Sequence, residues 1–130
     1  MLERIIILVL ILAGVFFLIK KGFYGSPKRI KNPVIDFTSI NSGLPTILYF
    51  WTEQCTQCVS LQNPALSKLK KQNQFFNLVS YNALNEVKIT KELNIKTVPS
   101  TVVLSQKKEI KFVNNGFASE KLLASQLKGI

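Results

Sequence analysis

Residues 48–58, with the sequence LYFWTEQCTQC, constrain the fold more than any other stretch of this 130-residue chain. An apolar run typical of a buried β-strand ends in a polar turn, and that turn carries both cysteines of the protein. Two cysteines separated by two residues at the start of a helix lie close enough to form a disulfide with little backbone movement. The pair can therefore alternate between a dithiol and a disulfide.

Cys55 is the expected nucleophile of this pair. It lies at the predicted N-terminus of a helix, where backbone N–H groups and the positive end of the helix dipole favour a thiolate over a thiol. The thiolate is the form that attacks a disulfide. Cys58, one turn further along, is the expected resolving thiol.

Two other roles are open to the cysteines. A structural zinc site needs four ligands, and the chain has two cysteines and no histidine, so only a dimer sharing two pairs could build one. A purely structural disulfide is the stronger alternative. It is weakened because a bridge across so short a loop removes little entropy from the unfolded chain.

The N-terminal segment has a long uncharged run. Residues 5–19 contain no charged side chain, and at about 1.5 Å per residue they cover roughly 22 Å, against a hydrocarbon core about 30 Å thick. With Arg4, Lys20 and Lys21 reaching toward the lipid headgroups, residues 1–21 are predicted to form one transmembrane anchor. A cleaved signal peptide is the alternative, but no small-x-small cleavage site follows the run.

The remainder divides into a basic linker, residues 22–33, and one domain, residues 34–130. Because positive charge is heavier after the apolar run than before it, the positive-inside rule predicts a single-pass protein of the cell membrane with a cytoplasmic domain. An extracytoplasmic domain stays open.

The formal net charge of +10 raises the possibility of nucleic-acid binding. Both arginines lie before residue 30, however, and the lysines of the domain are scattered along the chain. There is no basic stripe interleaved with aromatic residues. A solvated basic surface is the preferred interpretation, without a nucleic-acid partner.

The domain alternates between strand and helix patterns. Strands are expected at residues 34–37, 46–51, 78–81, 101–104 and 109–113, the last two forming a hairpin, and helices at residues 55–71, 86–93 and 119–128. Pro64 should kink or interrupt the first of these helices, in which Val59 and Leu61 are expected among the apolar anchors. Ser119 is the expected N-cap of the last helix. This order predicts an α/β fold, a mixed sheet with helices on both faces.

Several features together resemble the thioredoxin family over residues 34–130. They are the order of elements, the Phe50-Trp51 pair ahead of Cys55, the CTQC turn, the Val98-Pro99-Ser100 tripeptide before the hairpin, and Gly116 before the last helix. The resemblance implies a thioredoxin-like mixed sheet.

The resemblance also assigns roles to three residues besides the cysteines. Pro99 matches the cis-proline of the family, which lies beside the redox pair, and Val98 matches the residue whose backbone pairs with a substrate strand. Trp51 matches a tryptophan that packs beneath the active-site turn. An ordinary edge-strand proline and a core aromatic residue are the simpler interpretations of Pro99 and Trp51.

Three departures from the family pattern stand out. Tyr49 replaces the buried acid that assists proton transfer to the resolving cysteine. Gln54 replaces the tryptophan before the first cysteine, and Thr56-Gln57 replaces the usual Gly-Pro between the cysteines. The reduction potential should differ accordingly, in a direction that the sequence does not reveal.

The resemblance implies a thiol–disulfide oxidoreductase that reduces protein disulfides through Cys55 and Cys58, and the N-terminal run adds the expectation of a membrane anchor. Its partners would be protein thiols or disulfides and a thiol reductant or oxidant, and it would need no metal or organic cofactor. The alternative is a tethered thioredoxin-fold binding module with little or no redox turnover.

Overall fold

The apolar run before the cysteines forms the central strand β1 (Thr46–Trp51), as predicted. We describe the protein from a computed structural model that places residues 1–23, 41 and 43–130. The first five residues of β1 are buried because neighbouring strands flank it and helices cover both of its faces. Most of the predicted linker, from residue 24 onward, and the predicted strand at residues 34–37 lie outside the residues that the structure describes.

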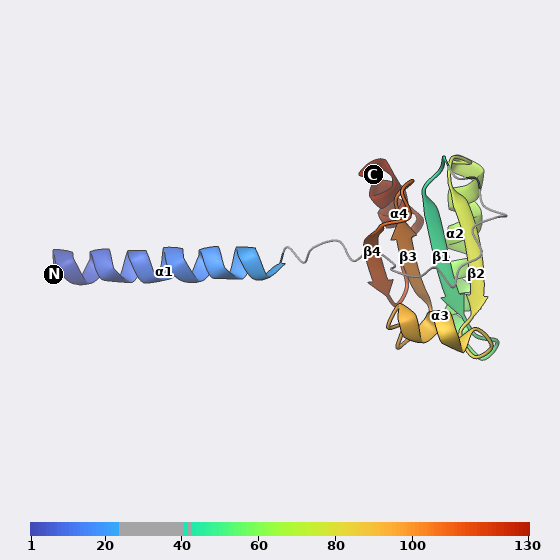
Figure 1. Ribbon diagram of the computed structural model, residues 1–130, viewed down its shortest axis with the longest axis horizontal. Coiled ribbons are helices and arrows are strands. Elements are labelled where there is room, and N and C mark those ends of the chain that lie inside the picture. Colours follow the sequence, from blue (N-terminus) through green and yellow to red (C-terminus); the bar gives the residue numbers. More distant parts are fainter. Residues whose placement is uncertain (24–40, 42) are drawn as a thin grey trace.

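Four strands form one mixed sheet in the order β2-β1-β3-β4 (Figure 1). Strand β2 (Asn77–Asn82) runs parallel to β1, and β3 (Ser100–Leu104) pairs antiparallel with its other edge. Strand β4 (Ile110–Asn115) completes an antiparallel hairpin with β3. The predicted mixed sheet and the predicted hairpin are therefore confirmed.

Successive side chains of β1 enter two different cores, because neighbouring residues of a strand point to opposite faces. Ile47 and Tyr49 pack in a cluster with side chains of α2 (Asn63–Gln72) and α4 (Glu120–Lys128). Leu48 and Phe50 pack in a second cluster, which includes Ile89 of α3 (Val87–Glu92). Helices thus cover both faces of the sheet, as predicted.

The helix after the cysteines differs from the prediction at its start. Residues 56–57 are α-helical, η1 (Cys58–Gln62) follows as a π-helical turn, and the helix continues as α2, with Pro64 in the first turn of α2. The expectation that Val59 and Leu61 anchor this helix was wrong, since they are 61% and 46% exposed. The buried positions of η1 are instead Cys58 and Gln62.

The predicted transmembrane anchor is corrected by the structure. Residues Leu2–Phe23 form α1, but among the described residues no helix is both long and apolar enough to cross a membrane. The uncharged run of residues 5–19 covers only about 22 Å, less than the roughly 30 Å of a hydrocarbon core, and charged residues flank it on both sides. The cellular location of the domain stays a prediction.

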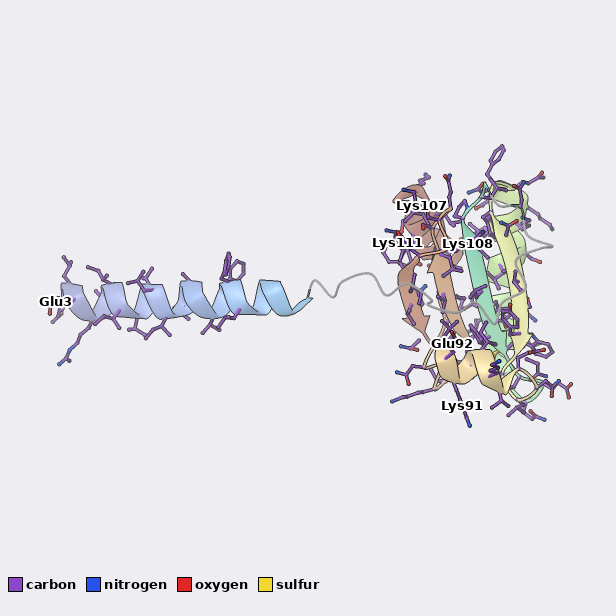
Figure 2. The ribbon with its side chains drawn as sticks, viewed as in Figure 1. Glu3, Lys91, Glu92, Lys107, Lys108 and Lys111 are labelled. Carbon is purple, nitrogen blue, oxygen red and sulfur yellow. A yellow bond between two sulfur atoms is a disulfide. The ribbon has the colours of Figure 1, made fainter. Side chains whose placement is uncertain are left out.

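Charged side chains lie at both ends of the sheet (Figure 2). Lys107, Lys108 and Lys111 gather around the turn between β3 and β4, whereas Lys91 and Glu92 lie on α3 at the opposite end. Ser119 caps α4, accepting a hydrogen bond from the backbone N–H of Leu122 at 3.2 Å, as expected. The β1 end that precedes the cysteines lies at the α3 end of the sheet (Figure 1).

Candidate active site

Cys55 and Cys58 form a disulfide at the C-terminal end of β1, with their Cα atoms 5.2 Å apart. A turn after β1 leads into the pair, in which the N–H of Cys55 donates to the carbonyl of Thr52 at 3.2 Å. Open α/β sheets place their sites at this end of their strands. The two sulfur-bearing residues differ in access, because Cys55 is partly exposed whereas Cys58 is only 1% exposed.

The backbone provides a hydrogen bond to the sulfur of Cys55. The N–H of Cys58 donates to Cys55 Sγ at 3.1 Å, and the helical segment starts at the next residue, Thr56. An N–H donor and a helix N-terminus both stabilise negative charge on a sulfur. The geometry suits Cys55 as the thiolate that attacks and Cys58 as the shielded partner.

Val98 and Pro99 come to the same end of the sheet as the cysteines. The register pairs Phe50 of β1 with Ser100 of β3, so the two residues before Ser100 lie beside the end of β1. The Val98–Pro99 peptide bond is cis. Pro99 is buried, and its carbonyl accepts a hydrogen bond from the N–H of Gly116 at 2.8 Å.

Trp51, Cys55 and Val98 are all partly buried and pack against the core cluster that contains Cys58. Trp51 ends β1, and its carbonyl accepts a hydrogen bond from the N–H of Ala83 at 2.8 Å, which ties the end of β1 to the loop after β2. The structure therefore brings the five residues singled out from the sequence to one place. Their individual roles in catalysis stay predictions.

The family of the chain follows from comparison with known proteins. The family model described as thioredoxin matches residues 35–128. The chain belongs to the thioredoxin family. No curated protein matches its sequence closely enough to serve as a relative.

Solved structures agree with this thioredoxin fold. The chain is similar to thioredoxin-2, a component of the protein secretion machinery of the malaria parasite, at 20% identity and a TM-score of 0.61, covering 67% of this chain and 84% of that one. It is similar to StoA from Bacillus subtilis at 23% identity and a TM-score of 0.58, with the same coverage of 67% and 84%. Identities this low show the shared fold alone.

Tyr49 occupies the place of the acid that thioredoxins bury beneath the cysteines. Its hydroxyl donates to Asn63 Oδ1 at 2.9 Å and lies 3.5 Å from the carbonyl oxygen of Cys58. Burial raises the pKa of Tyr49 to about 12, so this hydroxyl stays neutral at physiological pH. No acidic side chain is buried in the part of the chain that the structure describes.

Gln62 is a buried polar residue four positions after Cys58 that the sequence pattern did not single out. Its side chain is fully buried, and its amide makes two hydrogen bonds with the backbone of Ala118, at 2.9 and 3.0 Å. A signal was present, because Gln62 stands four residues from both Cys58 and Leu66, which lie on the buried side of the helical segment. A glutamine on that side needs hydrogen-bond partners in the interior.

A groove of about 430 Å³ opens beside this candidate site. Its lining comes from the end of β1, from the loop after β2 and from the segment before the cis-proline, and it includes Thr52, Leu84, Lys96 and Val98. Leu84 is 64% exposed there. The groove combines apolar and hydroxyl-bearing side chains with one cation, Lys96, and it includes Val98.

Metal binding finds no support in the geometry. Across residues 1–23, 41 and 43–130, no group of three or more His, Cys, Asp or Glu side chains is arranged to hold a metal ion. The chemistry that the arrangement does provide is that of a thiol pair at bonding distance within a thioredoxin fold, which supports thiol–disulfide exchange.

Proposed function

We propose that this protein is a thiol–disulfide oxidoreductase that reduces disulfides in protein substrates. The observation that carries the proposal is the asymmetric cysteine pair. Cys55 is accessible and its sulfur accepts a backbone hydrogen bond, whereas Cys58 is shielded directly behind it. This asymmetry separates an attacking thiol from a resolving thiol.

The reaction runs in two exchanges. The Cys55 thiolate attacks one sulfur of a substrate disulfide, the substrate S–S bond breaks, and one substrate sulfur leaves as a thiolate that takes up a proton from water. Cys58 then loses its proton to solvent and attacks Cys55 Sγ. The Cys55–Cys58 bond forms as the second substrate sulfur leaves, so the substrate gains two electrons and the protein loses two.

Substrate binding would use the surface beside the cysteines. The backbone of Val98, ahead of Pro99, is placed to pair with an extended substrate segment, as the family resemblance implies. The adjacent groove, with Leu84 and Lys96, suits an apolar residue near an acidic one in that segment. A separate thiol reductant must then restore the dithiol.

A Cys58→Ser variant tests the proposal by trapping its intermediate. Without a resolving thiol, the mixed disulfide between Cys55 and a substrate protein should persist and accumulate. Adducts should appear on non-reducing gels of the full chain incubated with disulfide-containing proteins, and dithiothreitol should release them. The Cys55→Ser/Cys58→Ser double variant is the matched control and should form none. Absence of adducts with Cys58→Ser would contradict the enzymatic role.

The reduction potential tests the direction of the reaction. A reductase should equilibrate near the value of thioredoxin, about −270 mV, whereas an oxidant would lie closer to about −120 mV. Free thiols of the full chain, counted by mass-shift alkylation across a dithiothreitol redox series, give this potential. A potential near about −120 mV would show that the protein oxidises its substrates and does not reduce them. The thiol–disulfide exchange chemistry would still hold.

A binding module with little redox turnover is the second candidate. The observation that favours it is the neutral hydroxyl of Tyr49 beneath Cys58, together with the lack of a buried acid among the described side chains. A module of this kind would keep its partners after Cys58→Ser without any covalent adduct. The trapping experiment therefore distinguishes the two candidates.

A further inference from the structure

The π-helical turn η1 is the first observation behind a further role. In η1 the N–H of Asn63 donates to the carbonyl of Cys58, five residues earlier. A π-turn contains one more residue than an α-helical turn and often marks a functional site. Here the turn starts at Cys58 itself, so whatever holds the turn also holds Cys58.

Two consecutive residues at the end of this turn attach it to distant parts of the fold. The Gln62 amide pairs with both the N–H and the carbonyl of Ala118, which lies in the loop before α4. Asn63 Oδ1 accepts a hydrogen bond from the hydroxyl of Tyr49, which lies in β1. The turn is therefore held from the loop on one side and from the sheet on the other.

The same attachment reaches the loop that contains the cis-proline. Ala118 is two residues beyond Gly116, whose N–H donates to the Pro99 carbonyl at 2.8 Å. Gly116 has a φ of 89°, a backbone conformation that glycine adopts without steric cost. Through these bonds the position of Cys58 is linked to the position of the surface on which a substrate would lie.

We propose that Gln62 and the Tyr49–Asn63 pair are positioning residues that hold Cys58 in place for attack on the mixed disulfide at Cys55. The proposal rests on the proposed oxidoreductase function. The three residues act on Cys58 through the turn η1 and need not touch the substrate. Holding the thiol near its target makes an intramolecular reaction faster and favours its product, here the Cys55–Cys58 bridge.

We call the hydrogen bonds of Gln62 and of the Tyr49–Asn63 pair the clamp. Two substitutions test it without removing volume from the core. Asn63 is exposed, so Asn63→Ala should fold, and Tyr49→Phe keeps the ring in the core. Each removes the neutral hydrogen bond between Tyr49 and Asn63, which is worth about a three- to tenfold change in an equilibrium or a rate, and Tyr49→Phe also removes the longer contact of 3.5 Å with the Cys58 carbonyl. We expect each variant to resolve a glutathione adduct of Cys55 about three- to tenfold more slowly, and to lower the glutathione equilibrium constant for bridge formation by a similar factor.

The measurement follows the full reduced chain after addition of oxidised glutathione, with alkylation and mass spectrometry to separate dithiol, adduct and bridge. The Asn63→Ala/Tyr49→Phe double variant should be no slower than the slower single variant, because both changes break the same bond. Gln72→Ala, an exposed amide at the far end of α2, is the matched control and should behave as the wild type. Thermal unfolding of the reduced variants, measured in parallel, reports any general loss of stability.

Several results would overturn the proposal. Wild-type rates in Asn63→Ala, additive effects in the double variant, or lower thermal stability with unchanged adduct resolution would each show that the clamp does not position Cys58. Gln62→Leu extends the test to the second attachment, and if that variant fails to fold, the Asn63 and Tyr49 variants decide. If the wild type itself never converts the glutathione adduct to the bridge, the proposed function fails first and the clamp fails with it.

Discussion

Cys55→Ser is expected to lower disulfide reduction to the level of a blank without protein. The serine hydroxyl is not ionised near neutral pH, so the variant has no nucleophile at the accessible position of the pair. Cys58 cannot replace it, because this residue is only 1% exposed and lies behind Cys55. Turnover of a test protein such as insulin, with dithiothreitol as the reductant, measures the loss.

The fold should survive this substitution. The bridge from Cys55 to Cys58 closes a loop with a sequence separation of 3, so it removes little entropy from the unfolded chain. Circular dichroism of Cys55→Ser should therefore match that of the reduced wild type. Residual turnover, or adducts that form through Cys58 in this variant, would reverse the assignment of the attacking and resolving thiols.

Phe50→Ala is expected to have the largest effect on stability. Phe50 is fully buried in β1, and its ring lies 5.5 Å from the ring of Tyr81 in a stacked arrangement. Removing the ring leaves a cavity among Leu48, Val102 and Ile89, which should cost about 3–5 kcal/mol. That is a large fraction of the roughly 5–15 kcal/mol that stabilises a typical domain. Urea unfolding of the reduced protein measures the change.

Phe75→Ala is the matched control for this experiment. Phe75 has the same side chain but is 77% exposed, so its removal should change the unfolding free energy by no more than about 0.5 kcal/mol. Equal losses in the two variants would mean that the sheet face covered by α3 is not packed as described.

The replacement of a buried acid by Tyr49 has a chemical consequence for the resolving step. A carboxylate can accept a proton from a thiol near neutral pH, whereas a tyrosine hydroxyl with a pKa of about 12 cannot take over that role as a base. Tyr49 instead forms a neutral hydrogen bond with Asn63. In the proposed reaction, water is therefore the expected acceptor of the Cys58 proton.

Much of the fold could be read from local patterns. Residues 47–51 of β1 are apolar, which is the pattern of a strand covered on both faces, and the turn residues 105–108 predicted the β3–β4 hairpin. The prediction that the N-terminal segment crosses a membrane was wrong. Apolar residues predict a helix well, but crossing a membrane depends on the length of the uncharged run, and residues 5–19 fall short of it.

The sequence alone determined the cysteine pair and the strand before it, because each depends on residues that are close together in the chain, whereas the place of Pro99 beside the pair was implied by the family resemblance. Only the tertiary structure revealed the hydrogen bonds around the turn that starts at Cys58. The bond between Gln62 and Ala118 joins residues 56 positions apart, and that between Tyr49 and Asn63 depends on a π-turn that no local pattern predicts. Buried polar groups need hydrogen-bond partners in the interior. Which partners lie within reach depends on how the whole chain packs in three dimensions.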